Sequence, residues 1–315
     1  MRMRVIVNSS AGTAISMSRE QLTAAIELPL KAAGHEVMFE VVEPEALQDA
    51  IERSVTEDFD ALIIGGGDGS VRSAAVKIMG SDKALGVIPL GTMNLLARDL
   101  GIPFAIGAAV NALSTASAAQ IDMARVNDHY FLCASIMGLV TQYSAERQQL
   151  RGKKWHERFP AYVSAIRSLL ASRHRMAVAI EDGREVTVLR ALSIAICSND
   201  YDETSGMMLK RSQLDGQTLT LYAAKHRSGW GMIGAVAKIL AGLSWNDPRL
   251  SKLRGNRFTI STRQRKVWLA NDGELEEVET PLIYTVLPGA LKVLKPAPSA
   301  EQTASEIFAL AMTHN

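Results

Sequence analysis

The feature that most constrains the fold is a regular alternation of short apolar runs with helix-forming segments over residues 1–125. The apolar runs read "MRVIV", "HEVMFEVV", "DALII" and "ALGVIPLG", and each is followed by a segment with helical periodicity or helix-forming composition. Continuous apolar strands separated by helices predict a parallel sheet that is covered on both faces. We therefore expect an α/β domain in this part of the chain.

Three turns that follow predicted strands carry glycine and polar residues. They are "NSSAG" from Asn8, "GGGDGS" from Gly65 and "PLGTMN" from Pro89. Ligands of open parallel sheets bind beyond the carboxyl ends of the strands. We expect the three turns to lie at one edge of the sheet and to line one shared cleft.

The glycine turn is suited to an anion. Gly66, Gly67 and Gly69 allow a ligand to approach the backbone N–H groups closely, and the helix that follows offers its positive end. The turn lacks the lysine of a Walker A loop and does not fit G-x-G-x-x-G. Asp68 would repel phosphate unless Mg²⁺ lies between them, so we expect it at a Mg-ATP site. Tight packing by the glycines, and capping of the following helix by Asp68, are the alternatives.

The turn after the next strand repeats the same arrangement. Gly91 permits the turn, while Thr92 and Asn94 offer a hydroxyl and an amide at a predicted helix start. An ordinary helix N-cap is the alternative interpretation.

Beyond Gln120 the pattern changes to repeated hairpin signals with few helices, which predicts an antiparallel β-sandwich over residues 126–296. Residues 297–315 read as a last helix. Of the 315 residues, 47% are hydrophobic and 21% are charged, which is typical of a globular protein. The first residues read directly as a strand, no apolar run reaches the ~20 residues of a membrane span, and the two cysteines have no partner spacing. We expect a cytoplasmic protein.

The net charge of +1 conceals two basic segments. Tyr143–Arg175 holds eight Lys and Arg against two acids, and Lys225–Lys266 holds ten against one. Within them, Arg147–Tyr162 and Trp230–Trp245 mix cations with aromatic residues. This mixture favours peripheral association with an anionic membrane surface. A solvated basic helix is the alternative, and no nucleic-acid-binding module is recognisable.

The motifs "GGGDGS", "PLGTMNLLARDLGIP", "IDMARVN" and "NDGE" occur in this order. With them the chain resembles the bacterial diacylglycerol kinase family, lipid kinases related to sphingosine kinase and more distantly to NAD kinase. The resemblance extends from the first strand to about Pro296. It implies a nucleotide-binding α/β domain, an antiparallel β-sandwich and the use of ATP and Mg²⁺. The implied reaction transfers the γ-phosphate of ATP to the hydroxyl of a diacylglycerol-like or other long-chain lipid alcohol.

The resemblance also implies roles for single residues. By this resemblance, Gly66 to Ser70 hold the ATP phosphates, Thr92 contacts the nucleotide with Asn94 beside it, and Asn8 opens a third turn of the same site. In "NDGE", Asp272 matches the aspartate proposed to take the proton from the lipid hydroxyl, and Glu274 is its companion. Without the resemblance, Asp272-Gly273 reads simply as a hairpin turn.

The chain departs from the family pattern at several positions. Ser9 replaces the proline of the first turn, and Arg72 stands where many relatives carry Asn. In "LDGQTLTL", either Gly216 or Asp215 falls on an aspartate that lies near a structural Mg²⁺ in the family; the Asp215 alignment keeps a metal ligand. These departures leave open a nucleotide- or lipid-binding protein that has lost catalysis. An NAD kinase is a second alternative, although its Leu-Gly-Phe-Leu segment is missing. The sequence specifies neither the lipid nor the oligomeric state.

Overall fold

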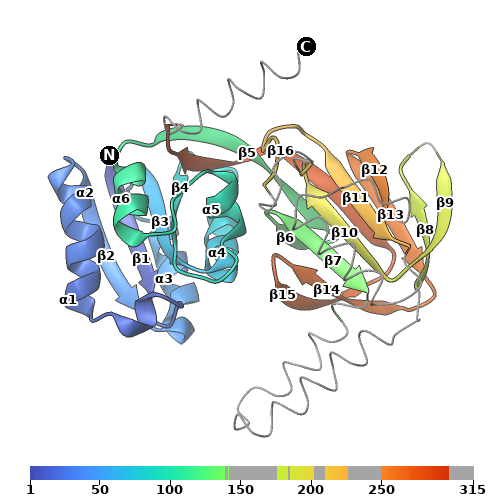
Figure 1. Ribbon diagram of the computed structural model, residues 1–315, viewed down its shortest axis with the longest axis horizontal. Helices are drawn as coiled ribbons and strands as arrows, with labels where there is room; N and C mark the ends of the chain where they lie inside the picture. The colour runs from blue at the N-terminus through green and yellow to red at the C-terminus, as the bar shows by residue number, and fades with distance from the viewer. Residues whose placement is uncertain (139–140, 142–175, 184, 202–209, 226–249, 298–315) are drawn as a thin grey trace, which may run out of the picture. The chain divides into compact units, whose positions relative to one another are not determined.

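A computed structural model describes residues 1–138, 141, 176–183, 185–201, 210–225 and 250–297. The chain divides into two compact units (Figure 1). Unit 1 comprises Met1–Gln120 together with the segment that begins at Leu291, and unit 2 is Ile121–Ala290. The division lies between Gln120 and Ile121, five residues before the boundary predicted from the sequence.

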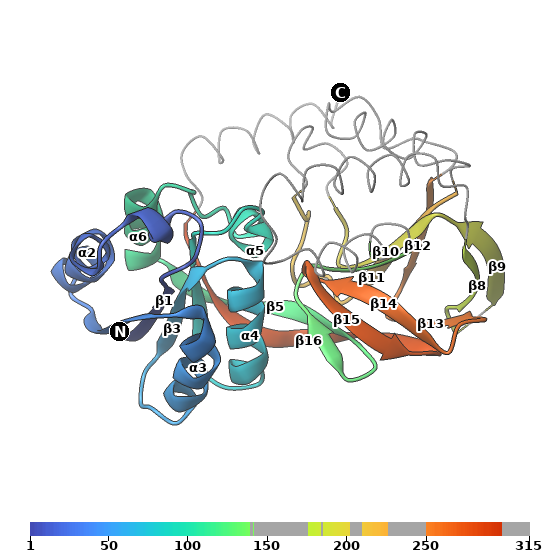
Figure 2. The same cartoon turned by 90° about the horizontal axis from the view of Figure 1, so that it is seen from below.

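Unit 1 is built on a parallel sheet with the strand order β2-β1-β3-β4, which the end of β16 extends beside β4. β3 and β4 are buried along their whole length, as their continuous apolar sequences predict. Figure 2 shows α3 and α4 on one face of this sheet and α2 and α6 on the other. The strands are β1 (Arg2–Asn8), β2 (Glu36–Val42), β3 (Ala61–Gly66), β4 (Ala84–Pro89) and β16 (Leu282–Lys295).

The helices of unit 1 connect consecutive strands. They are η1 (Ala14–Ser16), α1 (Arg19–Leu22), η2 (Thr23–Glu27), α2 (Leu28–Ala32), η3 (Pro44–Ala46), α3 (Leu47–Val55), α4 (Asp68–Ile78), α5 (Leu95–Asp99) and α6 (Ile106–Ser114). The first of the long helical segments starts with a capping box, in which Ser18 and Gln21 each bond the other's backbone. It ends before Gly34, whose φ of +86° is the left-handed conformation that favours glycine after a helix.

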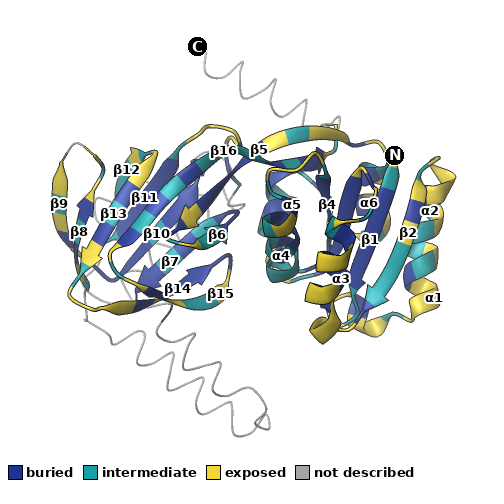
Figure 3. Ribbon diagram, turned by 180° about the vertical axis from the view of Figure 1, so that it is seen from behind, coloured by how far each residue is buried: buried dark blue, intermediate teal, exposed yellow. Residues whose placement is uncertain are grey.

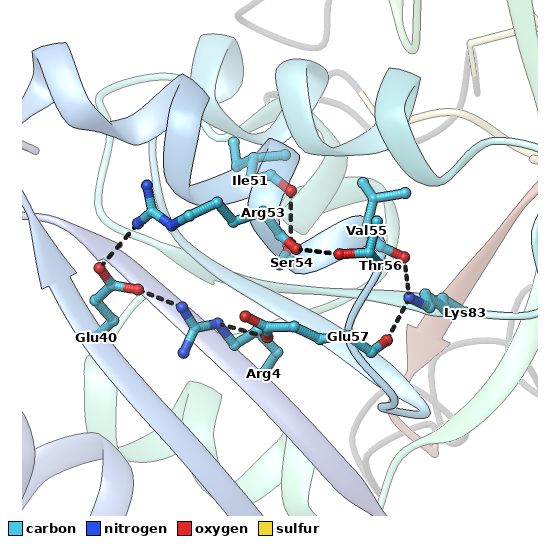
Figure 4. Close-up of polar contacts among 9 residues, drawn as sticks. All are labelled: Arg4, Glu40, Ile51, Arg53, Ser54, Val55, Thr56, Glu57 and Lys83. Atoms are coloured by element: carbon cyan, nitrogen blue, oxygen red, sulfur yellow. Dashed lines mark hydrogen bonds and ion pairs between the residues drawn. The ribbon is translucent and has the colours of Figure 1, made fainter.

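A cluster of charged side chains ties β1 and β2 to the loop after α3 (Figure 4). The buried guanidinium of Arg4 bonds the Glu40 carboxylate, and its Nε lies 3.3 Å from Glu57 Oε2. Arg53 reaches Glu40 from α3 at 3.4 Å, and Lys83 donates to the backbone carbonyl of Glu57 at 2.7 Å. Arg4 is therefore placed where two carboxylates compensate its buried charge.

Unit 2 is antiparallel and contains two sheets. One sheet has the order β12-β11-β10-β7-β14-β15. In the other, the first part of β16 is followed by β13, β8 and β9 in that order, while β5 pairs with β16 and β6 pairs with β5. The strands are β5 (Ser117–Val126), β6 (His129–Phe131), β7 (Ala134–Gly138), β8 (Met176–Glu181), β9 (Val186–Ala191), β10 (Ser193–Ser198), β11 (Leu219–Ala224), β12 (Leu250–Gly255), β13 (Arg257–Thr262), β14 (Lys266–Asn271) and β15 (Glu274–Glu279).

Side chains from both sheets of unit 2 form one buried core. Ile194 and Leu269 come from the six-stranded sheet, and Ile180 and Phe258 from the other. Figure 3 shows β10 and β14 mostly dark blue, the colour of buried residues. Two sheets that share one core are a β-sandwich. The predicted fold class, a parallel α/β domain followed by an antiparallel sandwich, is confirmed.

Several predicted segments cannot be compared with the structure. The aromatic basic stretches Arg147–Tyr162 and Trp230–Trp245, and the terminal residues 298–315, lie outside the described residues. Within the described ranges, no helix combines the length and the apolar character that a membrane crossing requires.

Candidate functional site

The three predicted turns lie at one edge of the unit 1 sheet. β1 ends at Asn8, β3 at Gly66 and β4 at Pro89, and these strands are parallel neighbours. The backbone N–H of Thr13 donates to the carbonyl of Leu90 at 3.3 Å, which joins the first turn to the third. A Cβ at Gly12 would lie 2.7 Å from that carbonyl oxygen, so this approach of the two turns requires glycine. The Asn8 side chain accepts from Ser10 N at 3.0 Å and holds the first turn closed.

Asp68 lies in the first turn of α4, but its carboxylate serves the next helix. Oδ2 accepts the N–H of Asn94 at 2.9 Å, and Oδ1 accepts the N–H of Leu95 at 2.6 Å. The N-cap residue of α4 itself is Gly67, which makes no side-chain cap bond. Through these two bonds the Asp68 carboxylate caps α5. The aspartate fastens the glycine turn to the turn after β4.

Two glycines meet where these turns cross. A Cβ at Gly91 would lie 2.5 Å from the Cα of Gly67, a separation that real Cβ atoms do not show. Gly91 does not have a positive φ, so close approach of two backbones, and not turn geometry, is its requirement. A Cβ at Gly66 would instead meet a side chain, at 2.7 Å from Ser70 Cβ and 2.8 Å from Ser70 Oγ.

Asn94 is buried and adopts the left-handed conformation, with φ of +47°. Its Oδ1 accepts from Gly91 N at 2.9 Å, and its Nδ2 donates to Gly91 O at 2.8 Å. The side chain thus closes the β4–α5 turn on itself and makes no cap bond to α5. Thr92, between these two residues, is exposed. The turn presents Thr92 outward while Asn94 supports it from within.

The start of α4 is the part of this edge that could hold an anion. The first N–H groups of a helix have no partner within the helix, and α4 is an eleven-residue helix whose dipole adds positive potential at that end. Gly69 and Ser70, in its first turn, are partly exposed. With Gly67 leading in and Ser70 adding a hydroxyl, the geometry suits a phosphate group.

Asp272 and Glu274 belong to unit 2, where they lie at the β14–β15 hairpin. Asp272 and Gly273 form its two-residue loop, with φ of +49° and +90°, as in a type I′ turn. The hairpin that the sequence indicates here is present. Glu274 opens β15 and is exposed, whereas Asp272 is only 7% exposed.

The Asp272 carboxylate accepts hydrogen bonds from three backbone N–H groups. Its Oδ2 accepts from Leu132 at 2.6 Å, and its Oδ1 accepts from Cys133 at 2.8 Å and Ala134 at 3.0 Å. These donors belong to the bend between β6 and β7. Three N–H groups stabilise the carboxylate charge and fix its orientation.

Sequence reasoning missed the residues that surround this hairpin. Arg211 is a buried arginine that donates to the carbonyls of Leu132 and Ser198 at 2.8 and 3.0 Å. Glu276 accepts from Asn271 Nδ2, and its Oε2 lies 3.1 Å from His129 Nδ1. An arginine or glutamate inside a strand-rich sequence gives no signal of burial, so only tertiary structure reveals these contacts.

The turn that contains Asp215 is held by another aspartate. Asp122, which is fully buried, accepts from Gln217 N at 2.6 Å, from Asn199 Nδ2 at 3.2 Å and from Gly289 N at 2.9 Å. Asp215 itself is exposed. Among the residues that the structure describes, no three His, Cys, Asp or Glu side chains group in a way that could hold a metal ion. A structural Mg²⁺ at Asp215 stays a prediction.

The comparisons with known proteins agree with the motifs. Residues 2–126 match the model of the diacylglycerol kinase catalytic domain. The proteins named diacylglycerol kinase in Staphylococcus aureus strains JH9 and Newman are 34% identical over 149 residues. That stretch is 46% of this chain and 46% of each relative, so the match spans about half the length of either.

Solved structures extend the likeness in fold to nearly the whole chain. The structure of a diacylglycerol kinase from Bacillus anthracis str. Sterne has a TM-score of 0.70 at 21% identity, covering 93% of this chain and 96% of that one. A second structure from the same organism reaches 0.71 with the same identity and coverage. At this identity the comparison supports the two-part fold.

Proposed function

We propose that the chain is an ATP-dependent lipid kinase of the bacterial diacylglycerol kinase family, since residues 2–126 match the model of that family's catalytic domain. It would transfer the γ-phosphate of ATP to the hydroxyl of diacylglycerol or of another long-chain lipid alcohol. The observation that carries the proposal is the fastening of two turns in unit 1, where the Asp68 carboxylate bonds Asn94 N and Leu95 N.

The fastened turns give a preorganised phosphate site. Gly91 packs against the backbone of Gly67, and Gly69 and Ser70, in the first turn of α4, are partly exposed, so their N–H groups are within reach of a ligand. Phosphoryl transfer depends chiefly on positioning and on neutralising charge, both of which such an arrangement supplies. We assign the ATP phosphates to Gly66 through Ser70, and the nucleotide contact to Thr92 with Asn94 behind it and Asn8 in the neighbouring turn.

The metal requirement needs a separate argument. Both Asp68 oxygens accept backbone N–H groups, but an ionised carboxylate has about four acceptor sites, so we keep Asp68 beside the Mg²⁺ of Mg-ATP. Since no three His, Cys, Asp or Glu side chains group to hold a metal among the described residues, we assign the catalytic ion to the ATP substrate, which carries it into the site. In this proposal Asp68 acts by holding the α5 turn in place.

Asp272 is the residue to which we assign the lipid hydroxyl. Its carboxylate is held by three N–H donors, which leaves it oriented rather than mobile. A fixed carboxylate can orient an attacking hydroxyl and accept its proton as the bond to phosphorus forms. Glu274, exposed in the same hairpin, is its proposed companion. We also propose that the protein works at a membrane surface, where its substrate resides.

The test is a panel of acceptors with radiolabelled ATP and Mg²⁺. Diacylglycerol, monoacylglycerol and a sphingoid base are offered in mixed micelles, and NAD is offered in buffer. Label in a lipid product supports the proposal and names the acceptor. Label in NAD alone would make the protein an NAD kinase. Binding of ATP with no transfer to any acceptor would make it a binding protein that has lost catalysis.

A further inference from the structure

The bend between β6 and β7 is bonded on both sides by charged residues of unit 2. On one side, the N–H groups of Leu132, Cys133 and Ala134 point at the Asp272 carboxylate, at 2.6 to 3.0 Å. On the other side, Arg211 Nη1 donates to the Leu132 carbonyl at 2.8 Å, and its Nη2 lies 3.5 Å from Cys133 Sγ. Both charged residues are buried, at 7% and 2% exposed.

One peptide group connects the two charges directly. The carbonyl of Leu132 and the N–H of Cys133 belong to the same planar amide. Arg211 bonds its oxygen, and Asp272 bonds its hydrogen. A cation at the oxygen polarises the amide and strengthens the hydrogen bond that its N–H donates. The arginine therefore supports the orientation of the aspartate without touching it.

The next peptide group is bonded in the same way. The Cys133 carbonyl accepts from Ser198 N at 3.0 Å, and the Ala134 N–H donates to Asp272. Arg211 also donates to the Ser198 carbonyl at 3.0 Å, which holds the end of β10 in place beside the bend. The guanidinium thus holds the Leu132 carbonyl and the end of β10 at Ser198, which both adjoin the amides that bond the Asp272 carboxylate.

We propose that Arg211 is a positioning residue for Asp272, acting through the Leu132–Cys133 peptide group. The inference rests on the proposed function only in giving Asp272 a part in catalysis. Burial of an arginine is costly unless its donors are satisfied, and here Nη1 donates to two carbonyls while Nη2 reaches Cys133 Sγ. A lysine at the same place keeps the charge, but its single nitrogen cannot take the positions of both Nη1 and Nη2.

The test compares Arg211→Lys and Arg211→Gln with a matched control, Arg254→Lys. Arg254 lies in the same unit, but its side chain is 62% exposed, and it pairs with Asp200. We expect Arg211→Lys to lower kcat at least about tenfold while KM for ATP stays within about twofold, since the nucleotide residues are in unit 1. In an Asp272→Asn background the same change should have little further effect, because coupled residues are not additive.

Amide hydrogen exchange provides a readout that does not depend on activity. The N–H groups of Leu132, Cys133 and Ala134 should exchange faster in Arg211→Lys than in the wild type. If the lysine variant does not fold, the same measurement is made on Arg211→Gln. Arg254→Lys should leave them unchanged. Unchanged exchange at these amides, or a loss of kcat that is equal in both backgrounds, would overturn the inference. If no acceptor is phosphorylated, the lipid kinase proposal fails, and faster exchange still supports the coupling of Arg211 to Asp272.

Discussion

Asp68 Oδ2 accepts the backbone N–H of Asn94 at 2.9 Å, across 26 residues of sequence. The two residues follow different strands of the unit 1 sheet, β3 and β4. Their bond makes one unit of two turns that would otherwise be independent loops. The aspartate that replaces the usual lysine of a phosphate loop is thus part of the scaffold of the proposed site.

The first prediction concerns this bond. Asp68→Asn has one oxygen where the carboxylate has two, so its NH₂ group would face an N–H that has lost its acceptor. We expect the free energy of unfolding to fall by about 1–3 kcal/mol. ATP affinity should fall by about tenfold or more, because the α5 turn loses its anchor. Urea unfolding and calorimetric titration with ATP measure the two effects.

Asp60→Asn is the matched control for this change. Asp60 precedes β3, and its side chain, 44% exposed, pairs with Arg2 and accepts the Arg2 backbone N–H at 2.8 Å, a bond that the asparagine oxygen can keep. An exposed pair contributes little, so the loss of stability should stay below about 1 kcal/mol and ATP affinity should not change. Equal effects of the two substitutions would show that the Asp68 contacts have no special part in the site.

The second prediction concerns the meeting of the two glycines. Gly91→Ala places a Cβ 2.5 Å from Gly67 Cα, so the two turns must move apart. Backbone atoms cannot move aside as the end of a flexible side chain can. We therefore expect the free energy of unfolding to fall by about 1–3 kcal/mol and most of the ATP affinity to be lost. Gly107→Ala is the control, since a Cβ there meets nothing within 4 Å and lies inside α6, where alanine favours the helix. Retention of ATP affinity in Gly91→Ala would contradict the packing argument.

The sheet of unit 1 and the position of its turns could be predicted because buried parallel strands leave an unmistakable apolar signature. The partner of Asp68 could not be predicted. Its bonds depend on how closely β3 and β4 bring Gly67 to Gly91 in space, and that distance cannot be read from the number of residues between them. The same limit explains why Gly91 suggested a turn, whereas the structure shows a requirement for close approach.

The hairpin at Asp272 was predictable from Asp-Gly, but the environment of its carboxylate was not. Its donors, Leu132 to Ala134, lie some 140 residues earlier in the chain. Arg211 stands in a sequence rich in turn signals, where an arginine is ordinarily exposed. The contacts of both side chains arise only when β7, β10 and β14 assemble, so local patterns carry no information about them.

A third prediction addresses the proposed catalytic carboxylate. In Asp272→Asn, one amide oxygen can still accept from Cys133 and Ala134, and asparagine tolerates the positive φ. The fold should therefore persist, while kcat falls at least about 100-fold and ATP affinity stays unchanged. Glu277→Gln, an exposed change in the next strand, should retain full activity. Near wild-type turnover of Asp272→Asn in the lipid assay would remove Asp272 from the mechanism.

A fourth prediction tests the buried charge in unit 1. Arg4→Met leaves Glu40 and Glu57 without the guanidinium that compensates them, and only 10% of the arginine side chain is exposed. We expect a loss of about 2–3 kcal/mol, less than for a fully buried pair because both carboxylates are 30% exposed. Arg53→Met, at a side chain that is 59% exposed, should cost below about 1 kcal/mol. Comparable losses in the two variants, measured by urea unfolding, would argue against a special role for the buried arginine.

The last prediction concerns alkaline pH and Tyr284, a buried tyrosine of unit 2 whose hydroxyl lies 3.2 Å from Ser135 Oγ. Burial raises the pKa of this hydroxyl above its ordinary value of 10.0, although the bond to Ser135 opposes the shift. Below pH 10 the tyrosine is protonated in the folded and unfolded chain alike, so its contribution to stability does not change. Above pH 10 the unfolded chain loses the proton while the folded chain keeps it, and stability falls by up to about 1.4 kcal/mol per pH unit.

Tyr284→Phe isolates this contribution. At pH 8 the variant should be less stable by about 1 kcal/mol, because Ser135 loses its hydrogen-bond partner. Between pH 10 and 11 its stability should decline less steeply than that of the wild type, since phenylalanine has no proton to lose, and the gap should narrow or reverse. Urea unfolding at pH 8, 9, 10 and 11 gives both curves. Parallel curves across this range would show that Tyr284 ionises as readily in the folded protein as in the unfolded chain, contrary to the effect expected of its burial.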